Sequence, residues 1–388
     1  MSKVSLLRCP NYETAEVEKA VRRSLELLGG VSNIVQPGQR VLVKPNLLAA
    51  TPPERAVTTH PALVAAVVRL LREAGAEVWV GDSPGGVEWK ITKRALEVSG
   101  IGPAAEEAGA RVIDFDAEGA TLVENPEGVV LKKFALAKAV LEADVVISLA
   151  KLKTHGQALY TGAVKNVLGC VPGGGKIRVH QLAPKSRQLA AALLDIFSVV
   201  RPAFGIIDGI VAMEGNGPNF GTPRRLGLLV ASRDCVAADA VACHLIGYPA
   251  RSIYILDQAT RRGLGTGSLD EIEVVGESPE SCRVPDFVHA SNLIFELTPA
   301  PLARLLGGLV RVEPVIDQET CRRCGLCQRS CPAGAIVGEG PFRIERARCV
   351  RCFCCHELCP HGAVGLRRSA LVRLYERLTR RQRETAVE

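Results

Sequence analysis

Two cysteine-rich runs decide how the end of this chain folds: CRRCGLCQRSCP at residues 321–332 and CVRCFCCHELCP at residues 349–360. Both follow the spacing C-x2-C-x2-C-x3-C-P, which is typical of bacterial ferredoxins that carry two [4Fe–4S] clusters. The first three cysteines of a run bind one cluster, and the fourth binds the other. The spacing therefore predicts one ligand set of Cys321, Cys324, Cys327 and Cys359, and a second set of Cys349, Cys352, Cys355 and Cys331.

Other uses of these cysteines explain the pattern less well. A zinc site also uses cysteine pairs, but it needs four ligands and no Cys-Pro ending. A disulfide framework suits a short secreted domain rather than a chain of 388 residues. Cys354 is an alternative third ligand of the second run, but it would leave four residues before Cys359. We therefore prefer Cys355 and expect Cys354 to lie near the cluster without binding it.

The composition indicates a globular protein of two or three domains, with 47% hydrophobic residues and 14 cysteines. The cysteines outside the two runs stand in apolar stretches, which suits buried, reduced thiols. Reduced thiols and iron–sulfur clusters both favour a reducing compartment, so we expect a cytoplasmic protein. No apolar segment resembles a signal peptide or is long enough to span a membrane, so we expect neither.

The net charge of +7 is concentrated in arginines after Cys321. A cluster bound by four thiolates carries net negative charge, and nearby arginines offset it. We therefore attribute this basic segment to the clusters and to an acidic redox partner protein, and we expect no nucleic-acid binding.

The first 312 residues alternate continuous apolar strands with amphipathic helices. Examples of the predicted strands are residues 40–44, 77–81, 144–148 and 204–208. This alternation is typical of an α/β fold, with a largely parallel sheet and helices on both faces. We expect this α/β domain over residues 1–312, a small α+β ferredoxin-like two-cluster domain over residues 313–366, and a basic C-terminal helix over residues 367–388.

Polar residues follow four of these strands. In an open α/β sheet, ligands bind beyond the carboxyl ends of the strands, so we expect these residues to converge on one pocket. The pocket would hold a small anionic ligand or an additional, unidentified anionic cofactor. The ligand-binding candidates are Lys44, Asn46, Asp82, Gly85, Gly86, Lys151 and Asn166. The catalytic candidates are His155, Lys153, Lys165, Asp208 and Glu214, with His155 as the acid or base because histidine titrates near neutral pH.

The densest polar stretch is KLKTHGQALYTGAVKNVLGCVPGGGKIRVH at residues 151–180. Residues 161–168 are expected to form a short helix whose first N–H groups are available to an anion. Asp239, on an apolar helix, needs a partner and is expected to hold a lysine or the backbone. The alternatives are a basic surface that attracts acidic partners, a structural His155, and a plain turn at Gly85 and Gly86.

Several motifs together resemble a known family, Domain of Unknown Function three-six-two. They are KPN (44–46), TTHP (58–61), GDSPGG (81–86), KLKTH and TGAVKN within 151–166, DGIVAMEGNGP (208–218) and SRDCVAADAVA (232–242). The resemblance covers nearly the whole chain and implies iron–sulfur binding, since the family is often fused to a two-cluster ferredoxin module. Cys235 stands where the family usually has proline. The resemblance implies no substrate.

A shorter stretch, from His155 through Lys165 to His180, is similar to part of the nickel-pincer lactate racemases. In those enzymes histidine and lysine hold a modified nicotinic acid nucleotide and its metal. The similarity implies that a related metal–nucleotide site is one alternative for this chain.

Three functions are therefore open. In the first, the clusters pass electrons to a substrate or cofactor in the α/β domain, which would make the protein an iron–sulfur oxidoreductase. In the second, it is an electron carrier or a maturation factor that docks a protein partner. The third is a metal–nucleotide enzyme of the racemase kind. We favour the first because a pure carrier needs few polar groups at strand ends.

Overall fold

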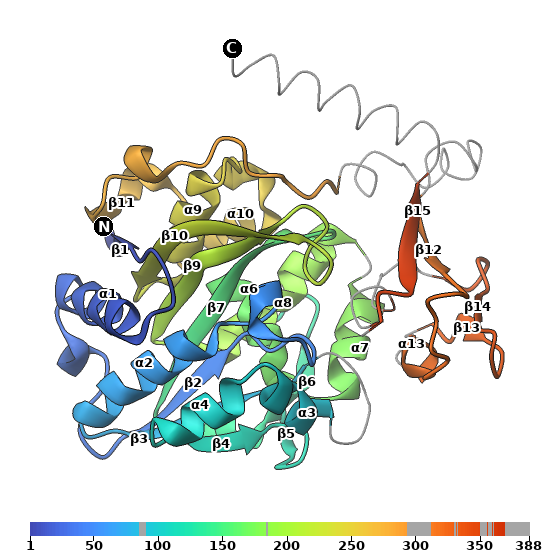
Figure 1. The fold of residues 1–388 in the computed structure, drawn as a ribbon, viewed down its shortest axis with the longest axis horizontal. Helices are drawn as coiled ribbons and strands as arrows, with labels where there is room; N and C mark the ends of the chain where they lie inside the picture. Colours follow the sequence, from blue (N-terminus) through green and yellow to red (C-terminus); the bar gives the residue numbers. More distant parts are fainter. Residues whose placement is uncertain are drawn as a thin grey trace.

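The computed structural model describes residues 1–84, 91–183, 185–292, 312–329, 331, 333–349, 355, 359 and 361–368. Its main feature is a nine-stranded sheet with the order β11-β1-β10-β9-β7-β2-β3-β4, to which β8 adds beside β7 (Figure 1). The strands are β1 (Ser2–Arg8), β2 (Arg40–Pro45), β3 (Glu77–Asp82), β4 (Arg111–Asp114), β7 (Val145–His155), β8 (Leu159–Thr161), β9 (Phe204–Glu214), β10 (Thr222–Ser232) and β11 (Ile272–Gly276).

Most of the sheet is parallel. Strands β4, β3, β2, β7 and β9 pair in parallel, as do β1 and β11. Strand β10 is antiparallel to both β9 and β1, and β8 folds back antiparallel on β7. A separate hairpin joins β5 (Ala120–Glu124) to β6 (Lys133–Ala137). The predicted α/β class with a largely parallel sheet is confirmed.

Helices cover both faces of the sheet, because the side chains of each strand alternate between two apolar cores. In β2, Val41 and Val43 enter one core while Leu42 enters the other. The first core packs under α1 (Thr14–Leu27), α2 (Pro61–Glu73), α3 (Ile91–Val98) and α4 (Ile101–Glu107). We call this side the α1/α2 face.

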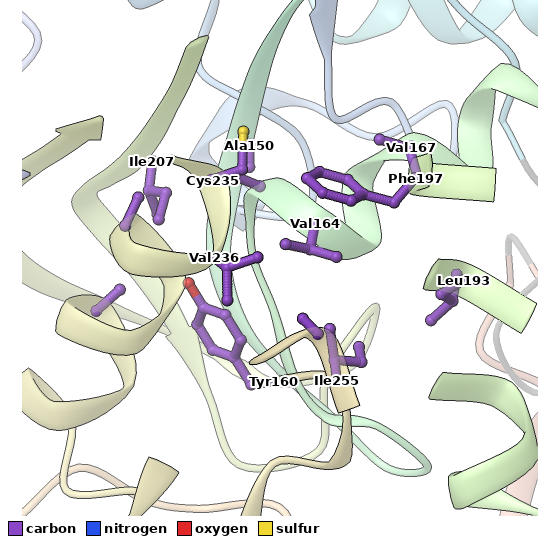
Figure 2. Close-up of a cluster of buried hydrophobic side chains, with 14 of the residues drawn as sticks. Ala150, Tyr160, Val164, Val167, Leu193, Phe197, Ile207, Cys235, Val236 and Ile255 are labelled. Atoms are coloured by element: carbon purple, nitrogen blue, oxygen red, sulfur yellow. The ribbon is translucent and has the colours of Figure 1, made fainter. Parts of the chain in front are cut away.

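The opposite side, called here the α8/α9 face, has the larger core. It packs under α5 (Lys138–Glu142), α6 (Ala163–Asn166), α7 (Gly174–Leu182), α8 (Ser186–Val200), α9 (Cys235–Leu245) and α10 (Tyr254–Arg261). Figure 2 shows its centre, where Val164 of α6, Phe197 of α8 and Val236 of α9 lie close to one another. In the part of the chain that the structure describes, no helix is long and apolar enough to cross a membrane.

Strands β7 and β9 are longer than the sequence pattern predicts. Both were expected to end where polar residues begin, at residues 148 and 208, but each continues for several residues. Lys151, Lys153 and His155 therefore lie within β7 rather than in a loop after it. The cause is pairing, because β8 binds the far end of β7 through the register Lys153↔Thr161 and satisfies its backbone groups.

The C-terminal module is a small α+β unit. Strand β12 (Val312–Ile316) pairs with β15 (Val364–Arg368), and β13 (Ile336–Val337) pairs with β14 (Arg343–Ile344); α13 (Leu326–Arg329) is one turn. Arg367 and Arg368, expected to begin the basic helix, instead end β15. Residues 369–388 of the expected helix lie outside the described residues.

Candidate functional site: cluster cysteines and the sheet edge

One cavity of the C-terminal module is lined by the four cysteines predicted to form one ligand set. They are Cys321, Cys324, Cys327 and Cys359. Apolar side chains, among them Ile316, Leu326 and Phe342, complete the wall. Among the described residues no three potential ligands lie close enough for a single metal ion, and a cube that spreads its four thiolates over four irons does not require that closeness. The donor set and the cavity fit a [4Fe–4S] cluster.

The second predicted set is described in part. Cys355 is buried in the same small core, and Cys331 packs against that core. Cys349 is half-buried. Cys352, and the bystander Cys354, lie outside the described residues.

Backbone N–H groups donate to the fourth cysteine of each run. The amide of Ala335 donates to Cys331 Sγ and that of Ala363 to Cys359 Sγ, both at 3.2 Å. Hydrogen bonds to the ligating sulfurs are one of the factors that set a cluster's reduction potential. In both halves of the module, the sulfur of the fourth cysteine therefore accepts a hydrogen bond from the amide four residues further along the chain.

Lys44 of β2 forms a buried ion pair with Asp82 of β3. Its Nζ lies 2.7 Å from Asp82 Oδ1, and both side chains are almost fully buried. Burial raises the pKa of Asp82, and the adjacent Lys44 opposes this rise. Lys44 Nζ also donates to Pro45 O at 2.8 Å and to Asn166 Oδ1 at 3.1 Å. An ammonium group has three N–H donors, so these acceptors occupy all of them.

The tight fit of this pair depends on Gly169. A Cβ atom there would lie 1.9 Å from Asp82 Oδ1 and 2.7 Å from Lys44 Nζ. Only glycine lets the backbone approach the ion pair this closely.

Lys151 of β7 forms a second buried ion pair, with Asp208 of β9. Lys151 Nζ lies 2.9 Å from Asp208 Oδ2 and 2.9 Å from the hydroxyl of Tyr12. That hydroxyl donates to Asp208 Oδ1 at 2.8 Å, and the amide of His60 donates to Asp208 Oδ2 at 3.0 Å. Burial lowers the pKa of Lys151, and Asp208 opposes this fall. One N–H of Lys151 is left without an acceptor among the described residues.

Sequence reasoning missed Tyr12 and His60. Their rings stack at a centroid separation of 3.5 Å, and burial lowers the pKa of His60 to about 4. TTHP was read as a helix start, and His60 does cap α2 by accepting from the Ala62 amide. No pattern in the sequence links Tyr12 to a strand almost two hundred residues away.

The two lysine side chains point to opposite faces of the sheet, so the strand ends do not all converge as expected. Lys44 alternates with Val43 and points toward α6 on the α8/α9 face, where Asn166 meets it. Lys151 and Asp208 point to the α1/α2 face, as do Leu149 and Ile206 in the same strands. The sheet itself separates the two lysine side chains.

Lys153 and His155 continue along the face that Lys151 occupies. Lys153 Nζ donates to Val57 O at 2.6 Å. His155 Nδ1 accepts from the backbone amides of Gln157 at 3.1 Å and Ala158 at 3.0 Å. A nitrogen that accepts two N–H groups carries no proton, so any proton of the neutral ring is on Nε2. This bonding favours the structural alternative for His155 over an acid or base acting through Nδ1.

The first turn of α6 is not available to an anion, which corrects the sequence prediction. Asp239 of α9 accepts from the amides of Ala163 and Val164, at 2.6 and 3.0 Å, and from the Tyr160 hydroxyl at 3.2 Å. Asp239 thus holds the backbone, as its burial required. Burial raises its pKa to about 7. Lys165, in the same helix, is half-buried.

The remaining candidates are spread around this edge. Glu214, at the end of β9, accepts from the Val288 amide at 3.0 Å and lies 3.8 Å from Arg224. Asn46 exchanges hydrogen bonds with Thr59 through its backbone. Gly85 and Gly86 lie outside the described residues.

A third polar cluster joins the GDSPGG loop to α7. Lys176 Nζ donates to Ser83 Oγ and, at 3.1 Å, to Pro84 O. Ser83 Oγ in turn donates to Asp116 at 2.8 Å. Burial lowers the pKa of Lys176 to about 8. Sequence reasoning missed Asp116, which follows β4 and shows no motif.

Three buried oxygen atoms of residues at or next to these strand ends have no hydrogen-bond partner among the described residues. They are Asn46 Oδ1, Thr58 Oγ1 and Thr161 Oγ1. Thr161 stands directly opposite Lys153 in the β7–β8 ladder, and Thr58 follows Val57, which accepts from Lys153. Buried polar atoms are normally satisfied, so this group suits a bound polar molecule or water.

Comparisons with known proteins match two parts of the chain. A family model described as a domain of unknown function (DUF362) matches residues 41–244, and one described as a 4Fe-4S dicluster domain matches residues 313–360. A thylakoid-associated protein of Synechocystis sp. is 38% identical over 262 residues, which cover 67% of this chain and 79% of that protein.

Two solved structures show a distant likeness. The lactate racemase apoprotein of Thermoanaerobacterium thermosaccharolyticum has a TM-score of 0.40 at 14% identity, covering 63% of this chain and 56% of its own. A Thermotoga maritima protein has a TM-score of 0.38 at 15% identity, covering 62% and 60% respectively. The match thus spans less than two thirds of either solved chain.

Proposed function

Because this chain belongs to the DUF362 family of unknown function and carries a 4Fe–4S dicluster domain, we propose that it is an electron-transfer protein that reduces or oxidises a small anionic ligand at the sheet edge. The two clusters would exchange electrons with that ligand and with a redox partner protein. If the ligand is a substrate that is released after its reduction or oxidation, the protein is an iron–sulfur oxidoreductase.

One observation carries this proposal: the loop at residues 215–221 touches both the sheet edge and the C-terminal module. The Gly217 amide donates to Thr154 Oγ1 at 3.2 Å, and Gly217 O accepts from the Gly156 amide at 3.3 Å. At its other end, Phe220 Cε1 is 3.3 Å from the position of a Cβ at Gly362. The loop therefore connects the sheet edge to the C-terminal module, along the path that electrons would take on this proposal.

The chemistry of the edge supports an anion as the ligand. Lys151 keeps one N–H donor, and Lys153 lies beside the unsatisfied hydroxyls of Thr58 and Thr161. Donors held in a buried site bind an anion more strongly than they would in water. Lys44 and Asn166 would support this edge from the opposite face, and Lys44 would do so together with its partner Asp82, with all three donors of Lys44 already used.

Native mass spectrometry of the full chain, purified without oxygen, tests the proposal. We expect a mass above that of the polypeptide plus two [4Fe–4S] clusters, and we expect Lys153→Met to remove the excess while both clusters remain. Lys19→Met, at an exposed position on α1, is the matched control and should keep the excess. A wild-type mass equal to the polypeptide plus two clusters would contradict the proposal.

The second candidate is an electron carrier that docks a protein partner. It is favoured by the hydrogen bonds that Asp208 already accepts from other residues of the protein. Its carboxylate accepts from Lys151, Tyr12 and the backbone amide of His60, so few of its lone pairs are available to a ligand. On this alternative, electron exchange with a partner protein is unchanged in Lys153→Met. The buried free thiols, for example Cys170 and Cys243, support a reducing compartment such as the cytoplasm for either candidate.

A further inference from the structure

The C-terminal module consists of two similar halves, and each predicted ligand set takes its fourth cysteine from the other half. The amide of Cys321 donates to Asp317 O, and the amide of Cys349 donates to Glu345 O, so each run begins in the same way. After the fourth cysteine, each half places a glycine in the left-handed region. These are Gly334, with φ +55°, and Gly362, with φ +65°.

The two glycines have different neighbours, which breaks the similarity of the halves. A Cβ at Gly362 would lie 3.3 Å from Phe220 Cε1, in the α/β domain. A Cβ at Gly334 would lie 3.0 Å from Arg348 Nη2, in the same module. Among the described residues, one half of the module therefore meets the α/β domain at the point where the other half meets its own arginine.

Gly362 stands close to the ligand shell of one cluster. The next residue, Ala363, donates its amide to Cys359 Sγ at 3.2 Å and lines the cavity that holds Cys321, Cys324 and Cys327. Phe220 thus lies beside Gly362, whose two chain neighbours, His361 and Ala363, both line this cavity. The corresponding position for the other cluster, beside Cys331, is occupied by Arg348.

We propose that the cluster site of Cys321, Cys324, Cys327 and Cys359 is the one next to the α/β domain, and that Phe220 shields it from water on that side. We call it the near site and the Cys349 set the far site. On the proposed function, each electron that a reduced partner protein supplies reaches the sheet-edge ligand through the near site. The placement of the near site rests on the contact alone, while this use of it rests on the proposed function.

The placement predicts opposite effects of two substitutions on the two reduction potentials. Phe220→Ala admits water beside the near site, and water stabilises the more negatively charged reduced state, so the near-site potential should rise. Arg348→Ala removes a positive charge beside the far site, so the far-site potential should fall. Each substitution should leave the other potential unchanged.

The test is a redox titration of the full chain, loaded with iron and sulfide and followed by electron paramagnetic resonance. Cys321→Ser and Cys349→Ser assign the two signals, since each removes a ligand from one site. Phe220→Leu, which keeps an apolar side chain in the loop, should shift the near-site potential less than Phe220→Ala and guards against a loop that fails to fold.

A rise confined to the Cys321-dependent signal in Phe220→Ala is the expected result. A shift of the Cys349-dependent signal, equal shifts of both, or no shift in either would overturn the placement. The potentials do not depend on any bound ligand, so this outcome is separate from the native mass measurement. A native mass without any excess over the polypeptide and two clusters would contradict the proposed function, but it would not affect the placement of the near site.

Discussion

Lys151 on β7 and Asp208 on β9 form an ion pair with 2.9 Å between Nζ and Oδ2, buried on the face of the sheet opposite the Lys44 side chain. Two buried ion pairs behind one sheet edge are costly to desolvate, and each is held by further hydrogen bonds. Tyr12 and His60 attach the segments before α1 and α2 to the Lys151 pair. The pair therefore fixes the position of both helices as well as the chemistry of the edge.

Lys151→Met is expected to lower the free energy of unfolding by about 3–5 kcal/mol, because it leaves the Asp208 carboxylate buried without its cation. Chemical denaturation without oxygen, followed by circular dichroism, measures the change. Lys19→Met, on the exposed side of α1, is the control and should change stability by less than about 0.5 kcal/mol. Equal stability of the two variants would show that Lys151 does not hold Asp208 in place.

Gly169→Ala is expected to destabilise the protein by about 3 kcal/mol or more, because its methyl group would displace the Lys44–Asp82 pair. Gly156→Ala is the matched control, since a Cβ at Gly156 meets nothing within 4 Å. The same denaturation experiment compares the two variants. A loss at Gly156 as large as that at Gly169 would argue against a specific contact with the pair.

The first turn of α6 should depend on pH through Asp239. The ordinary pKa of the carboxyl is 3.8, and burial raises it to about 7 in the folded protein. The folded state therefore keeps a proton that the opened state releases, and local stability falls as pH rises from 3.8 to about 7. Amide hydrogen exchange at Ala163 and Val164, corrected for intrinsic rates, should lose protection by about tenfold or more over this range.

Asp239→Asn should remove this pH dependence, because the amide cannot ionise and its oxygen still accepts from the helix. Protection that changes with pH equally in wild type and Asp239→Asn would assign the effect to another group.

His155 is expected to act through Nδ1, which holds the turn at Gln157 and Ala158. His155→Asn places an oxygen near the Nδ1 position, whereas His155→Gln places its polar atoms near Nε2. We expect the asparagine variant to keep most of the stability and the glutamine variant to lose about 1–3 kcal/mol, the cost of unsatisfied buried donors. Thermal unfolding ranks the two variants, and the opposite ranking would contradict the assignment.

Much of the fold follows from local patterns. The C-x2-C-x2-C-x3-C-P spacing identifies the cluster module because cluster geometry demands it, and the family match over residues 313–360 agrees. Apolar runs such as residues 40–44 predict buried parallel strands, and β2 and β3 occupy those positions. The need of Asp239 for a partner also follows from its apolar surroundings.

The arrangement of the edge could not be predicted, because it depends on long-range register. Lys151 and Lys153 look like loop residues until β8 pairs with β7 and extends it. A shift of one residue in the register of a strand moves each side chain to the other face of the sheet. The sequence therefore could not predict that Lys44 and Lys151 lie on opposite faces. Tyr12 belongs to the edge only because β10 and β9 bring the start of the chain beside Asp208.

A reductive titration of the anaerobically purified full chain tests most directly whether the clusters serve an electron acceptor at the sheet edge. Each [4Fe–4S] cluster takes up one electron, so any further uptake comes from a bound ligand. The account predicts that wild type and Lys19→Met consume more electrons than their two clusters hold, while Lys153→Met consumes only the electrons of its clusters. Equal uptake by wild type and Lys153→Met would contradict an acceptor held at this edge.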